Sequence, residues 1–201
     1  MTKNYWDEVF ESNPSYLHNE LEGKDHPSRA WSADILQRHQ SVLDVGCGTG
    51  VELESLRAKG LSISYTGTDY SLEACRAATA MYPTESFSQD DARGLHTFAD
   101  GSYDVVMLRH TLEHVNEWQK ALASAWRVAK KAVLVILWVT PDAGATKVDD
   151  KGGDAFYVHF AESDLIDLFA ALGARSWKKT VILDGVKDRP HRVDTCYEVT
   201  K

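Results

Sequence analysis

Short apolar runs alternate along the chain with stretches whose apolar residues have helical spacing. Runs rich in Val, Ile and Leu cover residues 42–45, 103–108 and 133–139, and such runs are typical of strands buried on both faces of a sheet. Residues 62–68 alternate as a strand does, and a short third strand is predicted near 86–88. The intervening stretches predict helices over 51–59, 72–80 and 116–129. This alternation predicts an α/β fold with a mostly parallel sheet.

The N-terminal part and the segment after the fifth strand do not follow this alternation. Two short helices are predicted near 5–10 and 33–37, joined by a stretch rich in Pro, Gly and His that runs through Pro14. Residues 140–156 form the longest polar, glycine-bearing stretch and predict a mobile loop. Because this loop leaves the carboxyl end of a strand, it is placed to cover a site there.

The C-terminal part predicts a helix and a closing hairpin. The helix covers 162–172 and stops at Gly173, and the two strands cover 175–183 and 193–199 around a turn that ends at Arg189-Pro190. Polar residues mark two helix starts upstream: Ser71 as an N-cap, and Asn116 with Gln119 at capping-box spacing.

The first strand ends in three glycines on alternate positions, in the sequence S-V-L-D-V-G-C-G-T-G over residues 41–50. Strand, glycine turn and helix bring backbone N–H groups to the carboxyl end of the strand, where open α/β sheets bind nucleotide-like ligands. Glycine allows close approach of a ligand and positive φ. A dinucleotide fingerprint would read G-x-G-x-x-G, and Val51 occupies the position of its third glycine. A nicotinamide-dependent oxidoreductase is therefore disfavoured.

This segment resembles the first motif of the class I S-adenosylmethionine-dependent methyltransferases, an aliphatic strand followed by D-x-G-C-G-x-G. The opening Y-W-D-x-x-F and the segment F-x-D-x-S-Y-D-V-V at 98–106 also resemble members with a methyltransferase type 11-like domain. The resemblance covers 42–200. It implies a three-layer Rossmann-like sandwich with a mostly parallel seven-stranded sheet and an antiparallel last strand. We expect one domain over 1–201, with a helical lid over 1–40 and a core over 41–201.

The same resemblance implies S-adenosyl-L-methionine as cofactor and S-adenosyl-L-homocysteine as product. Asp69, at the end of the second strand, would accept hydrogen bonds from the ribose hydroxyls. Asp90 or Asp91 would accept one from the adenine amino group, and Asp91 is favoured. Asp44 would act electrostatically near the methionine end or through the amides of the glycine turn. The residues expected to bind the cofactor are Asp44, Gly46, Cys47, Gly48, Thr49, Gly50, Asp69, Tyr70, Ser71, Asp90, Asp91, Ala92, Arg109 and His110.

In-line methyl transfer depends on alignment and exclusion of water more than on a fixed catalytic group. A hydroxyl or ammonium acceptor must also lose a proton, and histidine has a suitable pKa. His110 is the first candidate for a catalytic base, and a structural role for it stays open. Aromatic residues, Trp138 among them, hint at a planar or apolar acceptor, although they also suit core packing. Candidates for the substrate pocket are Trp6, Tyr16, Arg29, Trp31, His114, Tyr157 and His159.

Composition narrows the possible partners. The chain has 201 residues, 43% of them hydrophobic, as in a globular protein of one domain. Its net charge of −8 disfavours a nucleic acid partner. The three cysteines lack C-x-x-C spacing, and no carboxylate cluster follows the fourth strand, so neither a disulfide nor a metal site is expected. We expect no membrane span and a cytoplasmic location, because neither a long apolar run nor a signal region is present.

The sequence thus predicts an S-adenosylmethionine-dependent methyltransferase (EC 2.1.1.-) that acts on a small-molecule or metabolite acceptor. The alternative is a noncatalytic regulatory or partner module of the same fold that keeps the cofactor pocket. The oligomeric state stays open.

Overall fold

The computed structural model describes residues 4–13, 23–183 and 193–201. The helices are α1 (Tyr5–Ser12), α2 (Pro27–Leu36), α3 (Val51–Ala58), α4 (Leu72–Met81), the 3-10 helix η1 (Leu112–His114), α5 (Trp118–Val128) and α6 (Glu162–Ala171). The strands are β1 (Ser41–Val45), β2 (Ser64–Asp69), β3 (Ser86–Gln89), β4 (Tyr103–Arg109), β5 (Ala129–Leu137), β6 (Lys147–Gly152), β7 (Ala155–His159), β8 (Ser176–Leu183) and β9 (Val193–Thr200). The turns predicted at Pro14 and at Arg189-Pro190 lie outside the described residues.

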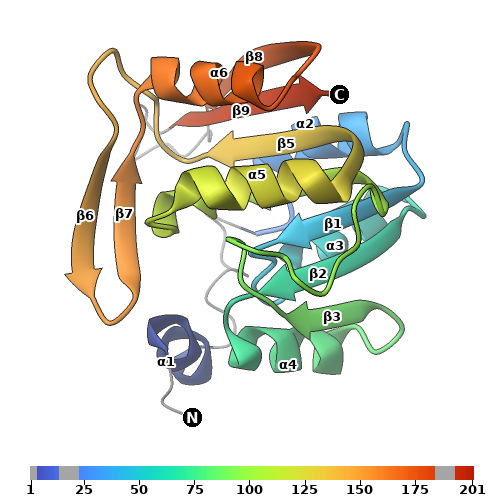
Figure 1. Ribbon diagram of the computed structural model, residues 1–201. Coiled ribbons are helices and arrows are strands. Elements are labelled where there is room, and N and C mark those ends of the chain that lie inside the picture. The colour runs from blue at the N-terminus through green and yellow to red at the C-terminus, as the bar shows by residue number, and fades with distance from the viewer. Residues whose placement is uncertain (1–3, 14–22, 184–192) are drawn as a thin grey trace.

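Seven strands form one sheet in the order β3-β2-β1-β4-β5-β9-β8 (Figure 1). The first five run parallel, whereas β9 is antiparallel to both β5 and β8. This arrangement confirms the predicted mostly parallel sheet with an antiparallel last strand. Among the described residues, no helix has the length and apolarity needed to cross a bilayer.

Alternate residues of the central strands pack against helices on opposite faces of the sheet. Val106 and Leu108 belong to a cluster with α5 and α6, while Val105 and Met107 belong to a second cluster with α2 and α3. All four side chains are fully buried. Both faces of the strand are therefore covered, which explains why its sequence is apolar without alternation.

The start of α5 differs from the sequence prediction. Asn116 and Gln119 do not form a capping box; the helix begins at Trp118, and its N-cap residue Glu117 makes no side-chain capping bond. The Asn116 side chain instead accepts a hydrogen bond from the amide of Glu117. By contrast, the Ser71 hydroxyl accepts from Ala74 N at 3.1 Å, so the predicted N-cap of α4 is confirmed.

The mobile loop predicted over 140–156 is wrong for much of that range, because β6 and β7 form an antiparallel hairpin there. Gly152, Gly153 and Asp154 make its turn with positive φ. Every residue of β6 is exposed, so the strand carries no apolar signal. Its partner β7 is anchored by the buried side chains of Ala155 and Val158.

The order of the strands reverses between β1 and β4. In open α/β sheets such a reversal leaves a crevice at the carboxyl ends of the strands. The parallel strands in Figure 1 point toward the side on which α1 and the β6–β7 hairpin lie. The fold therefore places the glycine turn after β1 beside the segment that follows β4.

Candidate active site

A cavity of about 850 Å³ lies at the carboxyl ends of β1, β2 and β4. It is lined by the glycine turn, by the segments after β2, β3 and β4, and by residues of α1 and the β6–β7 hairpin. One cavity thus brings together segments that are far apart in the sequence.

The glycine turn is held open by backbone conformation. Gly46, Gly48 and Gly50 have φ values of +75°, +54° and +87°, which only glycine adopts readily. A Cβ atom on Gly46 would lie 2.3 Å from the Thr111 hydroxyl oxygen. Gly46 and Cys47 donate backbone N–H bonds to the Thr68 carbonyl, at 2.8 and 3.0 Å, so the turn is fastened to the end of β2.

Asp69 joins the glycine turn to the start of α4. One carboxylate oxygen accepts from Gly48 N at 2.8 Å, and the other accepts from Ser71 N at 2.9 Å. Burial raises the pKa of Asp69 to about 6, although these amide hydrogen bonds oppose the rise. Each carboxylate oxygen can accept a further hydrogen bond, so the side chain can still bind a diol.

Asp44 lies beneath the turn in a buried polar group. Burial, with the nearby charge of Glu52, raises the pKa of Asp44 to about 7. Its carboxylate accepts from the Tyr65 hydroxyl at 2.6 Å. Arg29, which also lines the cavity, forms a buried ion pair with Glu52 at 2.5 Å. The Gly48 amide donates to Asp69 and not to Asp44.

Asp90, Asp91 and Ala92 form the cavity wall after β3. Thr97 donates to Asp90 through both its amide and its hydroxyl, at 2.9 and 2.6 Å. Arg93 holds Asp91 in a bidentate ion pair, with its shorter contact at 2.5 Å. Both carboxylates are thus fixed by neighbours at the rim.

Aromatic rings line the opposite part of the cavity. His114 contacts Trp6 edge-to-face with ring centroids 4.8 Å apart, and it stacks on Trp138 at 6.4 Å. Trp138 in turn meets Tyr157 edge-to-face at 5.0 Å. His114 Nδ1 lies 3.2 Å from the carbonyl oxygen of Phe156, so η1 is bonded to β7. Burial lowers the pKa of His114, which favours the neutral ring.

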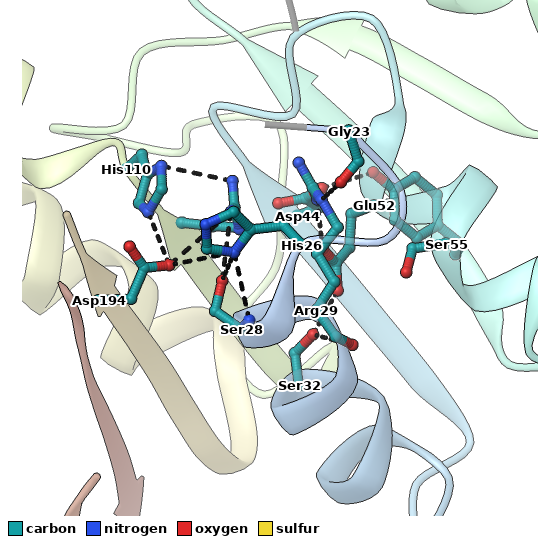
Figure 2. A network of polar contacts seen from close by, with 12 residues as sticks. Gly23, His26, Ser28, Arg29, Ser32, Asp44, Glu52, Ser55, His110 and Asp194 are labelled. Atoms are coloured by element: carbon teal, nitrogen blue, oxygen red, sulfur yellow. Dashed lines mark hydrogen bonds and ion pairs between the residues drawn. The ribbon is translucent and has the colours of Figure 1, made fainter. Parts of the chain in front are cut away.

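A buried polar cluster lies beside these rings, and Figure 2 shows it from close by. Asp194, the second residue of β9, is fully buried. Its carboxylate oxygen Oδ2 lies 3.1 Å from Nε2 of His110 and 3.8 Å from Nη2 of Arg109. Burial raises the pKa of Asp194, but the hydrogen bond and charge of His110 and the charge of Arg109 outweigh this and hold it at about 2.

Most of the residues expected at the cofactor site line this one cavity. They are Asp44, Gly46, Cys47, Gly48, Asp69, Tyr70, Asp90, Asp91, Ala92, Arg109 and His110. Thr49, Gly50 and Ser71 do not line it. Thr49 and Ser71 are fully buried, and Gly50 is the N-cap residue of α3.

Only some of the residues expected at the substrate pocket line the cavity. Trp6, Arg29, His114 and Tyr157 line the cavity. Trp31 does not, because it packs against the cluster formed with α2 and α3. His159 is exposed and lies 3.6 Å from Asp149 on the same hairpin, outside the cavity. Tyr16 lies outside the described residues.

Sequence reasoning missed several residues of the site. Tyr5, Phe10 and Phe156 line the cavity, and Glu52 and Asp194 hold cationic side chains beneath it. For α1 a signal was present, since Asn4 and Asp7 form a capping box. No local signal marks Asp194, because its significance depends on the pairing of β9 with β5.

Comparisons with known proteins identify the domain. A family profile described as a methyltransferase domain matches residues 43–137. The matched region, residues 43–137, belongs to the class I S-adenosylmethionine-dependent methyltransferases. The ubiquinone biosynthesis O-methyltransferase of Nitrosomonas europaea is 38% identical over 96 residues, which are 45% of this chain and 40% of that protein. The 2-methyl-6-phytyl-1,4-hydroquinone methyltransferase of Synechocystis is 33% identical over 116 residues, 56% of this chain and 36% of that protein. The matched segments therefore span well under half of these two relatives.

Solved methyltransferase structures share the fold over nearly the whole chain. The magnesium protoporphyrin IX methyltransferase of Synechocystis PCC 6803, solved with bound S-adenosylhomocysteine, has a TM-score of 0.71 and 15% identity, and covers 98% of this chain and 97% of its own. A chain from the complex of the Haloferax volcanii Trm112 methyltransferase activator with a methyltransferase has a TM-score of 0.75 and 17% identity, with 99% of both chains covered.

The residues present fit the cofactor of this class. The positive-φ glycines leave no side chain between the backbone and a ligand, and the Asp69 carboxylate has spare acceptor capacity at the same place. Acidic side chains at both ends of the cavity suit a ligand with hydroxyl, amino and ammonium groups. The cavity is thus chemically complementary to an adenosyl amino acid.

Proposed function

We propose that this protein binds S-adenosylmethionine in the cavity and transfers its methyl group to a small-molecule acceptor. The observation that carries the proposal is the continuity of the cavity. The glycine turn and Asp69 line one part of it, and His110 and the aromatic rings line another. The two reactants of a methyl transfer would therefore share one cavity.

The cofactor supplies a methyl group on a positively charged sulfur, which needs little further activation. The chain's own residues would bind and orient it. Asp69 would hold the ribose hydroxyls, Asp91 the adenine amino group, and the glycine turn the adjoining backbone. Asp44 and Arg29 would act at the amino acid end, where one matches an ammonium group and the other a carboxylate.

The acceptor would enter between α1 and the β6–β7 hairpin. Trp6, His114, Trp138 and Tyr157 offer ring faces and edges that suit a planar or apolar molecule. Of the two similar proteins described above, one is named for O-methylation in ubiquinone biosynthesis and the other for a hydroquinone. Both names fit a small acceptor with a ring.

Calorimetry with S-adenosylhomocysteine tests the cofactor part of the proposal. We expect the wild type to bind it and Asp69→Ala to bind it at least tenfold more weakly, because hydrogen bonds to a charged group contribute about 1.5 to 3 kcal/mol. Asp34→Ala, an exposed acid on α2, is the matched control and should bind normally. Equal affinity of the wild type and Asp69→Ala would refute the proposed cradle.

A turnover assay distinguishes the proposed enzyme from the alternative, a noncatalytic module. Methyl release should be followed with S-adenosylmethionine and a panel of small acceptors. Binding of the cofactor without methyl transfer to any acceptor in the panel would favour a regulatory or partner role.

A further inference from the structure

The structure points to a hydroxyl acceptor whose proton is taken by His110, with Asp194 as the residue that positions His110. We propose this as the chemistry of the acceptor part of the site; it rests on the proposed function. Asp194 is a positioning residue, since it acts through His110.

The hydrogen bonds around His110 determine which ring nitrogen carries the proton. Arg109 Nη1 lies 3.3 Å from His110 Nδ1. A guanidinium can only donate, so Nδ1 must be the acceptor in this contact. The proton of the neutral ring is therefore on Nε2, which faces Asp194 Oδ2 at 3.1 Å.

Asp194 is well suited to fix this tautomer. It is fully buried, and its carboxylate stays ionised because its pKa is held at about 2. His26 Nδ1 also lies 3.7 Å from the same oxygen, but this nitrogen accepts from the Ser28 amide at 3.2 Å. Of the two histidine nitrogens near this carboxylate oxygen, Nε2 of His110 is therefore the closer, at 3.1 Å against 3.7 Å for His26.

The backbone of His110 supports a functional assignment. Its φ is +54°, in the left-handed region that a non-glycine residue adopts at a cost of about 1 kcal/mol or more. The conformation is held by the His110 amide, which donates to the Ile136 carbonyl at 2.8 Å. It brings the ring to the cavity wall while Nε2 stays against β9.

The topology explains how Asp194 reaches this place. Because β9 is antiparallel to β5, its amino end pairs with the carboxyl end of β5, at Thr195 and Leu137. The start of β9 thus lies at the edge of the sheet where the parallel strands end. An acidic residue at this point of the strand meets the segment after β4.

The charge beside Nδ1 selects the kind of acceptor. An entering O–H group would donate to Nδ1 in place of Arg109, and the released guanidinium N–H would face the acceptor oxygen as negative charge develops there. An ammonium acceptor would be repelled by the same guanidinium. The proton passes from the acceptor oxygen to Nδ1 and later to water, while the proton on Nε2 stays in place beside Asp194.

Nitrogen-15 NMR of the histidine rings in the complex with S-adenosylhomocysteine tests the positioning role. We expect the wild type to show His110 in the Nε2–H tautomer and Asp194→Asn to show a mixture of tautomers or the other one. Asp104→Asn is the matched control: Asp104 is also a buried strand carboxylate in an ion pair, with Lys131, but it lies at the opposite end of β4. An Nδ1–H tautomer in the wild type, or no change in Asp194→Asn, would overturn the assignment.

Turnover with S-adenosylmethionine tests the acceptor class. The probes are catechol, hydroquinone and phenol, with benzylamine and cyclohexylamine, which are ammonium ions near neutral pH, as amine counterparts. We expect methylation of a hydroxyl probe, a loss of 100-fold or more in kcat for His110→Gln and Asp194→Asn, and a double variant no worse than either single one. The KM for S-adenosylmethionine should change less than twofold.

The pH profile separates a positioning role from a merely structural one. Arg109, Asp194, His26, Glu113 and His114 are charged or titratable groups around His110. Asp194→Asn should shift the acidic limb of kcat/KM, whereas Asp104→Asn should leave it in place. Faster methylation of the amines, or no methylation of the three hydroxyl probes by protein that binds S-adenosylhomocysteine, would contradict the inference. Failure of the wild type to bind S-adenosylhomocysteine would instead contradict the proposed function.

Discussion

Single residues in this protein carry charge and strain where the chain meets its cavity. Asp44, Asp69 and Glu113 are buried carboxyl groups whose pKa values are raised to about 7, 6 and 7. The pKa of Asp194, also buried, is lowered to about 2, because the hydrogen bond and charge of His110 and the charge of Arg109 together outweigh the effect of burial there. Burial therefore has opposite consequences depending on the neighbouring side chain.

Glu113 allows a direct test of the raised pKa values. Its pKa rises from 4.5 to about 7 through burial, so the folded protein binds a proton that the unfolded chain releases near pH 4.5. Stability should fall between pH 4.5 and 7, by up to about 3 kcal/mol from this group. Glu113→Gln keeps an acceptor for the Trp138 amide and should flatten this fall. Urea unfolding at pH 5 and pH 8 measures it.

The control for this experiment is Glu8→Gln, an exposed acid on α1. It should follow the wild type at both pH values. A fall of the same size in Glu113→Gln and the wild type would show that Glu113 is not the source.

Gly46 tests the glycine turn. In Gly46→Ala the added Cβ atom would clash with the Thr111 side chain, and alanine is strained at this positive φ. We therefore expect the free energy of unfolding to fall by about 2 to 5 kcal/mol. Gly101→Ala is the matched control, because Gly101 also has a positive φ (+58°) but no atom lies within 4 Å of the added Cβ. Its free energy of unfolding should fall by only about 1 to 2 kcal/mol. Urea unfolding compares them, and equal losses would argue against a steric role for Thr111.

Elements with a long periodic pattern could be predicted from the sequence, and elements that depend on partners could not. The helix predicted over 51–59 is α3, and the strand predicted over 103–108 is β4. The β6–β7 hairpin escaped prediction because β6 has no buried face, and the start of α5 was misplaced by a capping pattern that the structure does not use. The cofactor part of the site could be predicted because it follows a local motif. The position of Asp194 could not, because it depends on the order in which the strands pair.

The hydrogen bond that attaches the β6–β7 hairpin to η1 can be tested. His114→Ala removes the bond to the Phe156 carbonyl and should increase amide hydrogen exchange in β7 about two- to tenfold, the effect of losing about 0.5 to 1.5 kcal/mol. Hydrogen exchange with mass spectrometry measures it. His159→Ala, on the exposed part of the same hairpin, should leave exchange unchanged; equal increases in both variants would contradict an anchoring role for His114.

The cavity is lined by parts far apart in the chain, from α1 near the N-terminus to the β6–β7 hairpin. Asp7 of α1 accepts from the Ser71 hydroxyl at 2.8 Å, so α1 is fastened beside the Asp69 turn. The cavity depends on α1, the sheet and the hairpin together. Ligand binding in the cavity should therefore raise the free energy of unfolding of the whole protein.

A thermal shift tests this coupling. S-adenosylhomocysteine at about 100 times its Kd should add about 2.7 kcal/mol and raise Tm by about 5 to 10 °C. NADH at the same concentration should give no shift, and Asp69→Ala should lose most of the shift with S-adenosylhomocysteine. Stabilisation by NADH instead would revive the oxidoreductase interpretation.

The place of Asp194 in β9 has a consequence for biosynthesis. Translation proceeds from the glycine turn through His110 to β9, so the ribosome makes the histidine long before it makes the carboxylate that orients it. A nascent chain could already offer its nucleoside cradle while its histidine still lacked a fixed tautomer. Arrival of the last strand, rather than formation of the pocket, would then be the event that makes the protein chemically competent.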